Sequence, residues 1–323
     1  MSKSSPWEGV PTPVADYNVV RVPNTDGVPI YWGRDMAGQC LLIVELTGDF
    51  TEQLRRDGIS INAISVDLRQ GDLPNHQRLV FALARNVDSD LFQGLCETLI
   101  DGLREVEDSG TALSVAMTHL KRWKAFLAGR NARLLSPEEV RGLFGELQVL
   151  RKLYRDTLPK IDAVNAWCGP EDLHQDFIFG NRAIEVKTLS GRERSSIRIS
   201  SEDQLEALVD DLFVMTLRLS EMPDADTSRS LNDLVAEIER ELSESGAIEQ
   251  FSDKIAGIGY APLKEYDFPR FVVAGTQGYR VVESFPRLIR SKLPIGIAKV
   301  AYGIKLEAIV QYQCADDDLF GRL

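Results

Sequence analysis

The chain has 323 residues, of which 44% are hydrophobic and 27% charged, and these proportions exclude wholesale disorder, collagen and coiled-coil fibre. Its 49 Asp and Glu residues outnumber its 37 Lys and Arg residues, which gives a formal net charge of −12. That excess argues against a surface that is basic all over, as many nucleic-acid-binding proteins have, although it allows a local basic groove.

The four cysteines, Cys40, Cys96, Cys168 and Cys314, are too far apart in the sequence to have zinc-finger spacing. Scattered cysteines of this kind are typical of reduced thiols in a cytosolic protein. The N-terminus has no apolar core of a secretion signal, and no apolar run approaches the roughly 18 residues of a membrane helix. We therefore expect a soluble, cytoplasmic protein with no membrane partner.

The first third of the chain reads as strands followed by helices. Alternating apolar residues predict strands at 17–22, 28–32, 40–45, 59–68 and 78–83. From about residue 90 the spacing becomes helical, with one stripe at Leu91, Leu95, Leu99 and Leu103 and another at Leu113, Met117, Leu120 and Phe126. The Glu-Asp-Ser-Gly segment at 107–110 predicts a break, so we expect an N-terminal β-rich module with a closing helix over residues 1–108.

The rest of the chain, 109–323, is predicted to be one domain with a motif core at 136–222, an acidic helical insertion at 223–256 and C-terminal strands at 257–323. Ser136, Pro137 and Glu139 form a capping-box pattern, which predicts a helix from there to about Leu158. Three short strands are expected between 176 and 200, and a helix capped by Ser200 or Ser201 is expected to bury Leu205, Leu208, Leu212, Met215 and Leu219. A helical stretch is expected at about 230–256, and strands at 270–274, 279–282 and 299–313.

The segment 176–187 carries the strongest chemical signal. Gly180-Asn181 suits a two-residue hairpin turn, because both residues tolerate positive φ. That turn pairs residue 179 with 182, 178 with 183, 177 with 184 and 176 with 185. Strand alternation then predicts an apolar face of Phe177, Phe179, Ile184 and Val186, and an opposite face that carries Asp176, Glu185 and Lys187.

On this second face Asp176 is expected to lie opposite Glu185, where two like charges repel each other. A divalent cation held between the two carboxylates converts the repulsion into attraction, and Mg²⁺ prefers oxygen ligands completed by phosphate and water. Lys187 points the same way and can hold a water or stabilise charge on a phosphoryl oxygen. The pattern predicts a metal-dependent phosphodiester hydrolase. A solvated hairpin face with mixed charges is the structural alternative, and for these three residues taken alone it has the better odds.

Two residues outside the hairpin extend the pattern. Glu146 lies in the preceding helix beside Leu143, Leu147, Leu150 and Leu153, and can stand at the edge of that buried stripe as a third carboxylate. Gln204 is expected in the first turn of the helix after the third strand, where an amide can orient a lysine or a phosphate. A solvated helix glutamate and an ordinary polar first-turn residue are the respective structural alternatives.

The order of helix with Glu, strand with Asp, strand with Glu-x-Lys, third strand and Gln resembles the PD-(D/E)XK nuclease superfamily. More narrowly, the chain is similar to the bacterial family named "PD-(D/E)XK motif protein". The points of resemblance are FGELQVL at 144–150, HQDFIFGNRAIEVKTLS at 174–190, ISSEDQL at 199–205 and GIAKVAYGIKLEAIVQY at 296–312. The resemblance implies an α/β (α+β) fold with a restriction-endonuclease-like core: a mixed central sheet flanked by helices, preceded by the β-rich region.

By this resemblance Asp176 and Glu185 are metal-binding acids, Lys187 is the catalytic lysine, Glu146 is an auxiliary helix acid and Gln204 is an accessory residue. Gln175 stands where the family motif has Pro, a proline that is often missing in the superfamily. Asp172, after Pro170-Glu171, is a rival first acid, but it lies outside the hairpin pairing. The implied cofactor is Mg²⁺, with Mn²⁺ able to substitute for it.

The charge is distributed unevenly. Residues 121–160 contain ten basic and four acidic side chains, and 269–305 contain seven basic and one acidic, a net +6 in each segment. These segments are candidates for phosphate contacts, with a solvated surface as the equal alternative. The predicted DNA-binding residues are Arg151, Lys152, Arg192, Arg194 and Arg198. Residues 202–254, with fifteen acidic and four basic side chains, are predicted to avoid DNA and to face a protein partner or the solvent.

The leading hypothesis is a Mg²⁺-dependent DNA endonuclease that belongs to a restriction-modification or phage-defence system, with other subunits of that system as partners and a homodimer as a possibility. The alternative is a non-catalytic DNA-binding or scaffolding subunit that uses a nuclease fold and assembles through the acidic 202–254 region. An RNA substrate is a third reading that the residues leave open.

Overall fold

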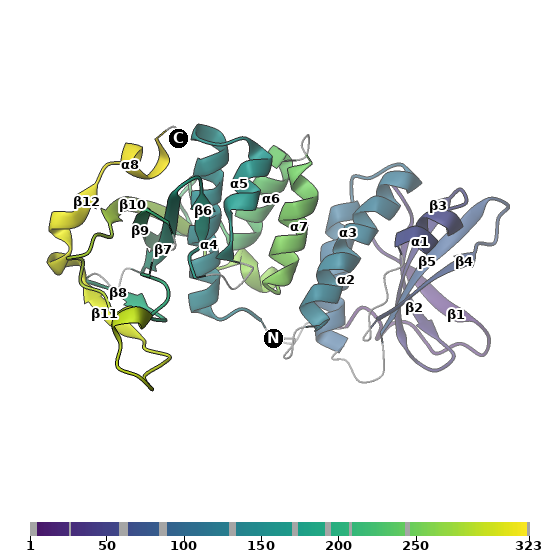
Figure 1. Cartoon of the computed structure of the whole chain (residues 1–323). Helices are drawn as coiled ribbons and strands as arrows, with labels where there is room; N and C mark the ends of the chain where they lie inside the picture. Colours follow the sequence, from purple (N-terminus) through teal and green to yellow (C-terminus); the bar gives the residue numbers. More distant parts are fainter. Residues whose placement is uncertain are drawn as a thin grey trace. The chain divides into compact units, whose positions relative to one another are not determined.

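The computed structural model describes residues 5–25, 27–57, 64–83, 89–128, 134–169, 174–190, 195–206, 209–242 and 246–321. The chain divides into two compact units (Figure 1). The first consists of Met1–Arg133 with Ile255–Lys264, and the second of Leu134–Lys254 with Glu265–Leu323. The first unit is thus longer than the β-rich module expected over 1–108, because the helix that follows residue 108 belongs to it.

The first unit contains a five-stranded antiparallel sheet in the order β1-β2-β3-β5-β4. Its elements are β1 Tyr17–Arg21, β2 Ile30–Asp35, β3 Cys40–Thr47, α1 Thr51–Asp57, β4 Ile64–Gln70, β5 His76–Leu83, α2 Ser89–Leu103 and α3 Ser109–Ala128. β3 is buried over most of its length, since it is the central strand and a run of aliphatic residues suits burial on both faces. The strands predicted from alternation are confirmed, apart from residues 59–63, which lie outside the described residues.

Tryptophans build the core of this unit. Trp7 and Trp123 are fully buried, and the Trp7 ring stacks on Phe92 of α2 with 5.5 Å between ring centroids. The indole N–H of Trp7 donates to the Leu41 carbonyl at 2.9 Å, which satisfies the polar edge that burial would otherwise leave unpaired. These rings therefore serve packing and are not available for stacking on bases.

The second unit has a mixed sheet in the order β12-β10-β9-β7-β6, in which only β7 and β9 are parallel, and a small β11-β8 pair. Its strands are β6 Phe177–Phe179, β7 Arg182–Leu189, β8 Ser196–Ile199, β9 Asp211–Glu221, β10 Phe271–Arg280, β11 Tyr302–Lys305 and β12 Gln313–Cys314. Its helices are α4 Pro137–Asp156, α5 Lys160–Ala166, α6 Leu231–Leu242, α7 Ala247–Gly257 (shared with the first unit) and α8 Asp316–Phe320, with single 3₁₀ turns at Lys264–Asp267, Arg290–Lys292, Leu306–Ala308 and Val310–Tyr312. The architecture is the mixed α and β arrangement expected from the sequence.

Helix α4 begins as the capping pattern predicts. The Ser136 hydroxyl accepts from the Glu139 N–H at 3.2 Å, and the Glu139 carboxylate accepts from the Ser136 N–H at 2.7 Å. Its apolar stripe packs against β7, and Gly145 makes the close approach possible: a Cβ there would lie 2.4 Å from the Thr188 methyl group. This contact sets the position of Glu146, the next residue along the helix.

The helix predicted after Ser200 is wrong. Residues 201–205 form turns, and Asp211–Glu221 is the longest strand of the second unit, β9. Leucines and methionines spaced as on a helix also occur in a strand buried on both faces, where nearly every position is apolar. β9 lies between β7 and β10, and all its residues from Leu212 to Leu217 are buried.

The C-terminal strands also differ from the prediction. The strands expected at 270–274 and 279–282 are one strand, β10, with an irregular register between Val273 and Gly275. The strand expected at 299–313 is divided into β11, two 3₁₀ turns and β12. A bulge explains the first difference, because an extra residue interrupts the alternation that marks a strand.

Candidate active site

The predicted hairpin register is confirmed for the three residue pairs that β6 and β7 form. Phe177 pairs with Ile184, Ile178 with Ala183 and Phe179 with Arg182, and Gly180 takes φ +55° in the turn. The ladder ends at Phe177. Asp176 and Glu185 are therefore not backbone partners, although the sequence predicted that they would be. The main chain at Asp176 turns toward another segment, where its carbonyl accepts from the N–H groups of Cys168 and Gly169 at 2.8 and 3.2 Å.

The short β6 leaves the next part of β7 without a strand on that side. The Asp176 carboxylate fills this place, because its Oδ2 accepts from the Val186 N–H at 2.7 Å. An unpaired N–H at a sheet edge needs an acceptor, and a carboxylate gives a charge-assisted bond. The sequence-predicted first acid is therefore held beside Glu185 by its side chain, without the cross-strand pairing.

Glu185 and Lys187 form the centre of the site. Glu185 is only 1% exposed, and its Oε1 lies 2.6 Å from the Lys187 Nζ. The other oxygen of the same carboxylate, Oε2, is buried and has no hydrogen-bond partner in the structure. An unpaired buried carboxylate oxygen is costly, so this atom marks a place for a cation or another donor.

Gln204 reaches the same lysine, although the turn over residues 201–205 carries it and not a helix. Its Oε1 accepts from the Lys187 Nζ at 3.1 Å and from the Ser200 N–H at 2.8 Å. The Lys187 ammonium is thus held between a carboxylate and an amide oxygen. The predicted accessory role of Gln204 in orienting the lysine remains a proposal, and the contact it requires is present.

Glu146 enters from α4. Its Oε2 accepts from the indole N–H of Trp167 at 2.8 Å, and a Cβ at Gly169 would lie 2.5 Å from the same oxygen. Burial, together with the charge of Asp176, raises the pKa of Glu146 to about 8, against the opposing effects of the Trp167 hydrogen bond and Lys187.

The three carboxyl groups share one electrostatic environment. Burial raises the pKa of Asp176, and Lys187 and the Val186 N–H partly oppose this. Burial, then the charge of Asp176, raises the pKa of Glu185 well above its usual value. When the pKa values of neighbouring carboxyl groups are all raised, too little positive charge lies near them to stabilise their ionised forms. Clusters of this kind are enriched at functional sites.

These groups line one open cleft of about 720 Å³ in the second unit. Its lining combines the acids Glu146, Asp176 and Glu185 with Lys187 and Gln204, and also includes Arg141 and Arg198. All five predicted catalytic residues are therefore brought together, from α4, the start of β6, β7 and the 201–205 turn. Their separation in sequence is closed by the α4–β7 packing and by the turn that follows β8.

The donor set fits a hard divalent cation. Within the described ranges no three His, Cys, Asp or Glu side chains are arranged as a complete metal site. Mg²⁺ requires less than that, because one or two carboxylates with phosphate and water are enough. The unpaired Oε2 of Glu185 beside Asp176 supplies this minimal set, whereas Lys187 neutralises the other oxygen of Glu185.

The predicted DNA-binding residues have different positions. Arg198 is exposed and lines the cleft. Arg192 and Arg194 lie outside the described residues. Arg151 pairs with Glu237 at 2.9 Å and Glu241 at 3.5 Å, and Lys152 pairs with Asp156 at 3.4 Å and Asp316 at 3.2 Å.

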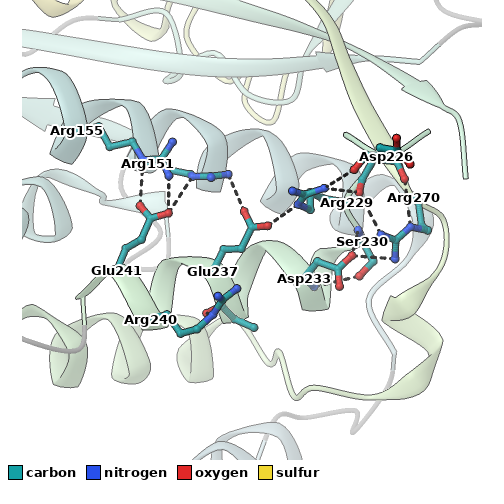
Figure 2. A network of polar contacts seen from close by, with 12 residues as sticks. Arg151, Arg155, Asp226, Arg229, Ser230, Asp233, Glu237, Arg240, Glu241 and Arg270 are labelled. Carbon is teal, nitrogen blue, oxygen red and sulfur yellow. Dashed lines mark hydrogen bonds and ion pairs between the residues drawn. The ribbon is translucent and has the colours of Figure 1, made fainter. Parts of the chain in front are cut away.

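The C-terminal part of α4, which carries Arg151 and Arg155, and the acidic α6 therefore neutralise each other in part. Figure 2 shows Arg151 and Arg155 facing Glu237 and Glu241, and the network continues through Arg229 to Arg270 and Asp233. The expected separation into a basic and an acidic surface does not hold here, because the two charged segments pack on each other.

Sequence reasoning missed two residues that support the site. Gln175 is 1% exposed, and its Nε2 lies within hydrogen-bonding distance of the carbonyls of Asp203, Gln204 and Glu206, at 3.3, 3.3 and 3.2 Å. Trp167 is fully buried and orients Glu146. The polar Gln at a position where the motif has Pro could have pointed to the role of Gln175. Nothing in the sequence around Trp167 pointed to its contact with Glu146.

This arrangement of helix acid, hairpin acids and lysine defines a PD-(D/E)XK-like nuclease core. Comparison with protein families gives the same answer: the family described as "Putative PD-(D/E)XK family member, (DUF4420)" matches residues 4–307. The chain belongs to this family, which covers nearly its whole length. No curated protein and no solved structure matches the chain. No helix in the described residues is long and apolar enough to cross a membrane.

Proposed function

We propose that the cleft is the active site of a metal-dependent endonuclease that hydrolyses phosphodiester bonds of DNA. The observation that supports this most directly is the set of groups around Glu185: an unpaired buried carboxylate oxygen, a second acid at Asp176 and the Lys187 ammonium at 2.6 Å. A solvated hairpin face, the structural alternative, does not require a buried acid, and Glu185 is 1% exposed.

In this proposal Asp176 and Glu185 hold Mg²⁺ or Mn²⁺, with Glu146 as an auxiliary acid. When bound, such a cation supplies positive charge to the scissile phosphate and lowers the pKa of water. Water attacks phosphorus, one P–O ester bond breaks, and the products are a phosphate monoester and a free hydroxyl end. Lys187 stabilises the charge that develops on the phosphoryl oxygens, and Gln204 directs its ammonium toward them.

Arg198, which lines the cleft and is exposed, is the side chain we propose for contacts with the DNA backbone, whereas Arg141 also lines the cleft but pairs with Glu138 at 3.5 Å. Arg192 and Arg194 remain proposals from the sequence. The ion pairs of Arg151 and Lys152 leave these two side chains less charge to offer a phosphate. A role in a restriction-modification or phage-defence system, with further subunits, rests on the family resemblance and is proposed with the activity.

The test is nicking of a supercoiled plasmid in Mg²⁺ by the native chain, Asp176→Asn, Lys187→Ala and the control Asp224→Asn, whose carboxylate is exposed and outside the cleft. We expect cleavage by the native chain and the control only, and no cleavage in EDTA. Equal activity in all four proteins would contradict the mechanism. DNA binding without cleavage by any of them would favour the non-catalytic subunit, and cleavage of RNA alone would change the substrate.

A further inference from the structure

The segment between β10 and β11, residues 281–301, carries aliphatic side chains that no core covers. Leu288 and Ile297 are about half exposed and Ile295 is fully exposed, at 44%, 50% and 107% of their reference areas. In Figure 1 this segment projects from the part of the second unit that carries β8 and β11. Exposed aliphatic side chains this close together in one loop make it a candidate contact surface.

The tip of this loop is a defined turn. The Ile297 N–H donates to the Pro294 carbonyl at 3.1 Å, and Gly296 takes φ +92°, as the third position of a type II turn requires. The side chain of Ile295 occupies the second position of that turn, where it points away from any packing. We call residues Pro294–Ile297 the apolar tip.

The base of the loop is held firmly by acids. Both oxygens of Glu202, a 1% exposed residue, accept from the backbone: Oε1 from the Lys299 N–H at 3.2 Å and Oε2 from the Val300 N–H at 2.8 Å. The Arg290 guanidinium donates two bonds of 2.7 Å to Asp203. These anchors restrict the base of the loop, and a restricted loop loses less entropy on binding.

These anchors connect the loop to the active site. Glu202 and Asp203 belong to the same turn as Gln204, which contacts Lys187. On its C-terminal side the loop leads directly into Ala301 and Tyr302, which line the cleft. The Lys187 ammonium in the cleft and the base of the loop are therefore both held by the same turn.

The charge of the loop selects the class of ligand. Residues 284–301 contain Arg287, Arg290, Lys292 and Lys299 and no acid. Arg290 is neutralised by Asp203, and Lys292 lies 3.5 Å from the exposed Glu283. This leaves Arg287 and the exposed Lys299 to give the loop its positive charge. Positive charge beside exposed aliphatic groups is complementary to DNA, which offers stacked bases between two phosphate backbones.

We propose that the apolar tip inserts Ile295, supported by Ile297, between base steps of the DNA bound at the cleft, and unstacks it next to the scissile phosphate. This inference rests on the proposed function for its ligand, and it adds a deformation of the DNA that cleavage by itself does not require. Aliphatic wedges of this kind unstack a base step and kink the duplex.

The experiment measures unwinding separately from cleavage. Plasmid is relaxed by a metal-independent type IB topoisomerase in EDTA, with the Lys187→Ala protein bound, and its linking number is compared with that of free plasmid. We expect a shift in linking number, because an inserted side chain unwinds the step it enters. Adding Ile295→Ala and Ile297→Ala should abolish the shift and weaken DNA binding at least about tenfold.

Two further variants are controls. Val310→Ala, which removes a 53% exposed aliphatic side chain elsewhere in the second unit, should keep the shift, and Ile295→Leu should retain most of it. A tip-dependent shift with no cleavage by the native chain would support the wedge and overturn the nuclease. Cleavage by the native chain, together with an unchanged shift in the tip variant or with no shift by the Lys187→Ala protein that keeps the tip, would overturn the wedge alone. A protein that binds no DNA overturns both.

Discussion

Gln175 places its side-chain amide 3.3 Å from the carbonyl of Gln204, and also within hydrogen-bonding distance of the carbonyls of Asp203 and Glu206 in the same segment. A residue next to the hairpin acid therefore fixes the turn that holds Lys187. Gln175 stands where the motif has Pro, and its side-chain amide makes contacts that the apolar proline side chain cannot make.

We predict that Gln175→Met lowers the cleavage rate about 10–100-fold, since residues that orient a site commonly have effects of this size. The Mg²⁺ concentration needed for half-maximal cleavage should change less than the rate. Gln277→Met is the matched control, because Gln277 also donates from its amide to main-chain carbonyls in the second unit, at 2.9 and 3.3 Å, but outside the cleft. Equal losses in the two variants would mean that Gln175 only supports the fold.

The raised pKa values of the site carboxyl groups predict a cleavage rate that increases with pH. A carboxyl group must lose its proton before it holds a cation, and the pKa of Glu146 is raised to about 8. At subsaturating Mg²⁺ we expect activity to rise from about pH 6 to about pH 9, and the rise to be smaller in Glu146→Gln. A pH profile that is identical in the two proteins would remove Glu146 from the metal site.

The same pKa shift predicts that Glu146 destabilises the folded chain at high pH. The pKa of Glu146 is higher in the folded chain than in the unfolded one, where it is about 4.3, so the folded state binds the proton more tightly and loses stability as the pH rises between the two values. In EDTA, Glu146→Gln should be more stable than the native chain by about 1–3 kcal/mol at pH about 8.5, and the difference should vanish below pH about 4. Urea unfolding at both pH values checks this.

Two glycines of α4 predict opposite results. Gly145→Ala places a methyl group 2.4 Å from Thr188 of β7, so the helix must move away from the sheet and take Glu146 with it. We expect a loss of about 1–3 kcal/mol in the free energy of unfolding and a loss of activity. Gly142→Ala, one turn earlier with no atom within 4 Å of the new Cβ, should instead stabilise the helix by up to about 1 kcal/mol. Thermal unfolding of the two variants distinguishes them.

His119 predicts acid sensitivity in the first unit. Burial, helped by Arg122, lowers the pKa of His119 to about 3, and its Nδ1 is buried without a hydrogen-bond partner. The unfolded chain binds this proton below pH about 6.5 whereas the folded chain does not, so stability falls as the pH drops from about 6.5 toward 3. The loss is about 2 kcal/mol at pH about 5 and should be absent in His119→Gln, as measured by urea unfolding.

The hairpin and its acids were predictable from the sequence because their order is local. A Gly-Asn turn sets the register of a two-stranded hairpin, and alternation then places Phe177 and Ile184 on the apolar face and Glu185 on the other. The capping box of α4 was equally local, since the side chains of Ser136 and Glu139 each bond to the other residue's backbone. The resemblance to a nuclease family added the expected roles of Glu146 and Gln204, which stay predictions.

Tertiary structure decided the rest, since it depends on which segments pack together. The Leu and Met residues of 205–219 fit a helix by spacing, and only their place between β7 and β10 makes Asp211–Glu221 a strand. The basic and acidic segments, far apart in sequence, neutralise each other through Arg151 and Glu237. The net charge of −12 and the local hairpin chemistry were fixed by composition and order, whereas the charge that reaches the cleft is set by packing, because burial and pairing change what each ionised group presents to a ligand.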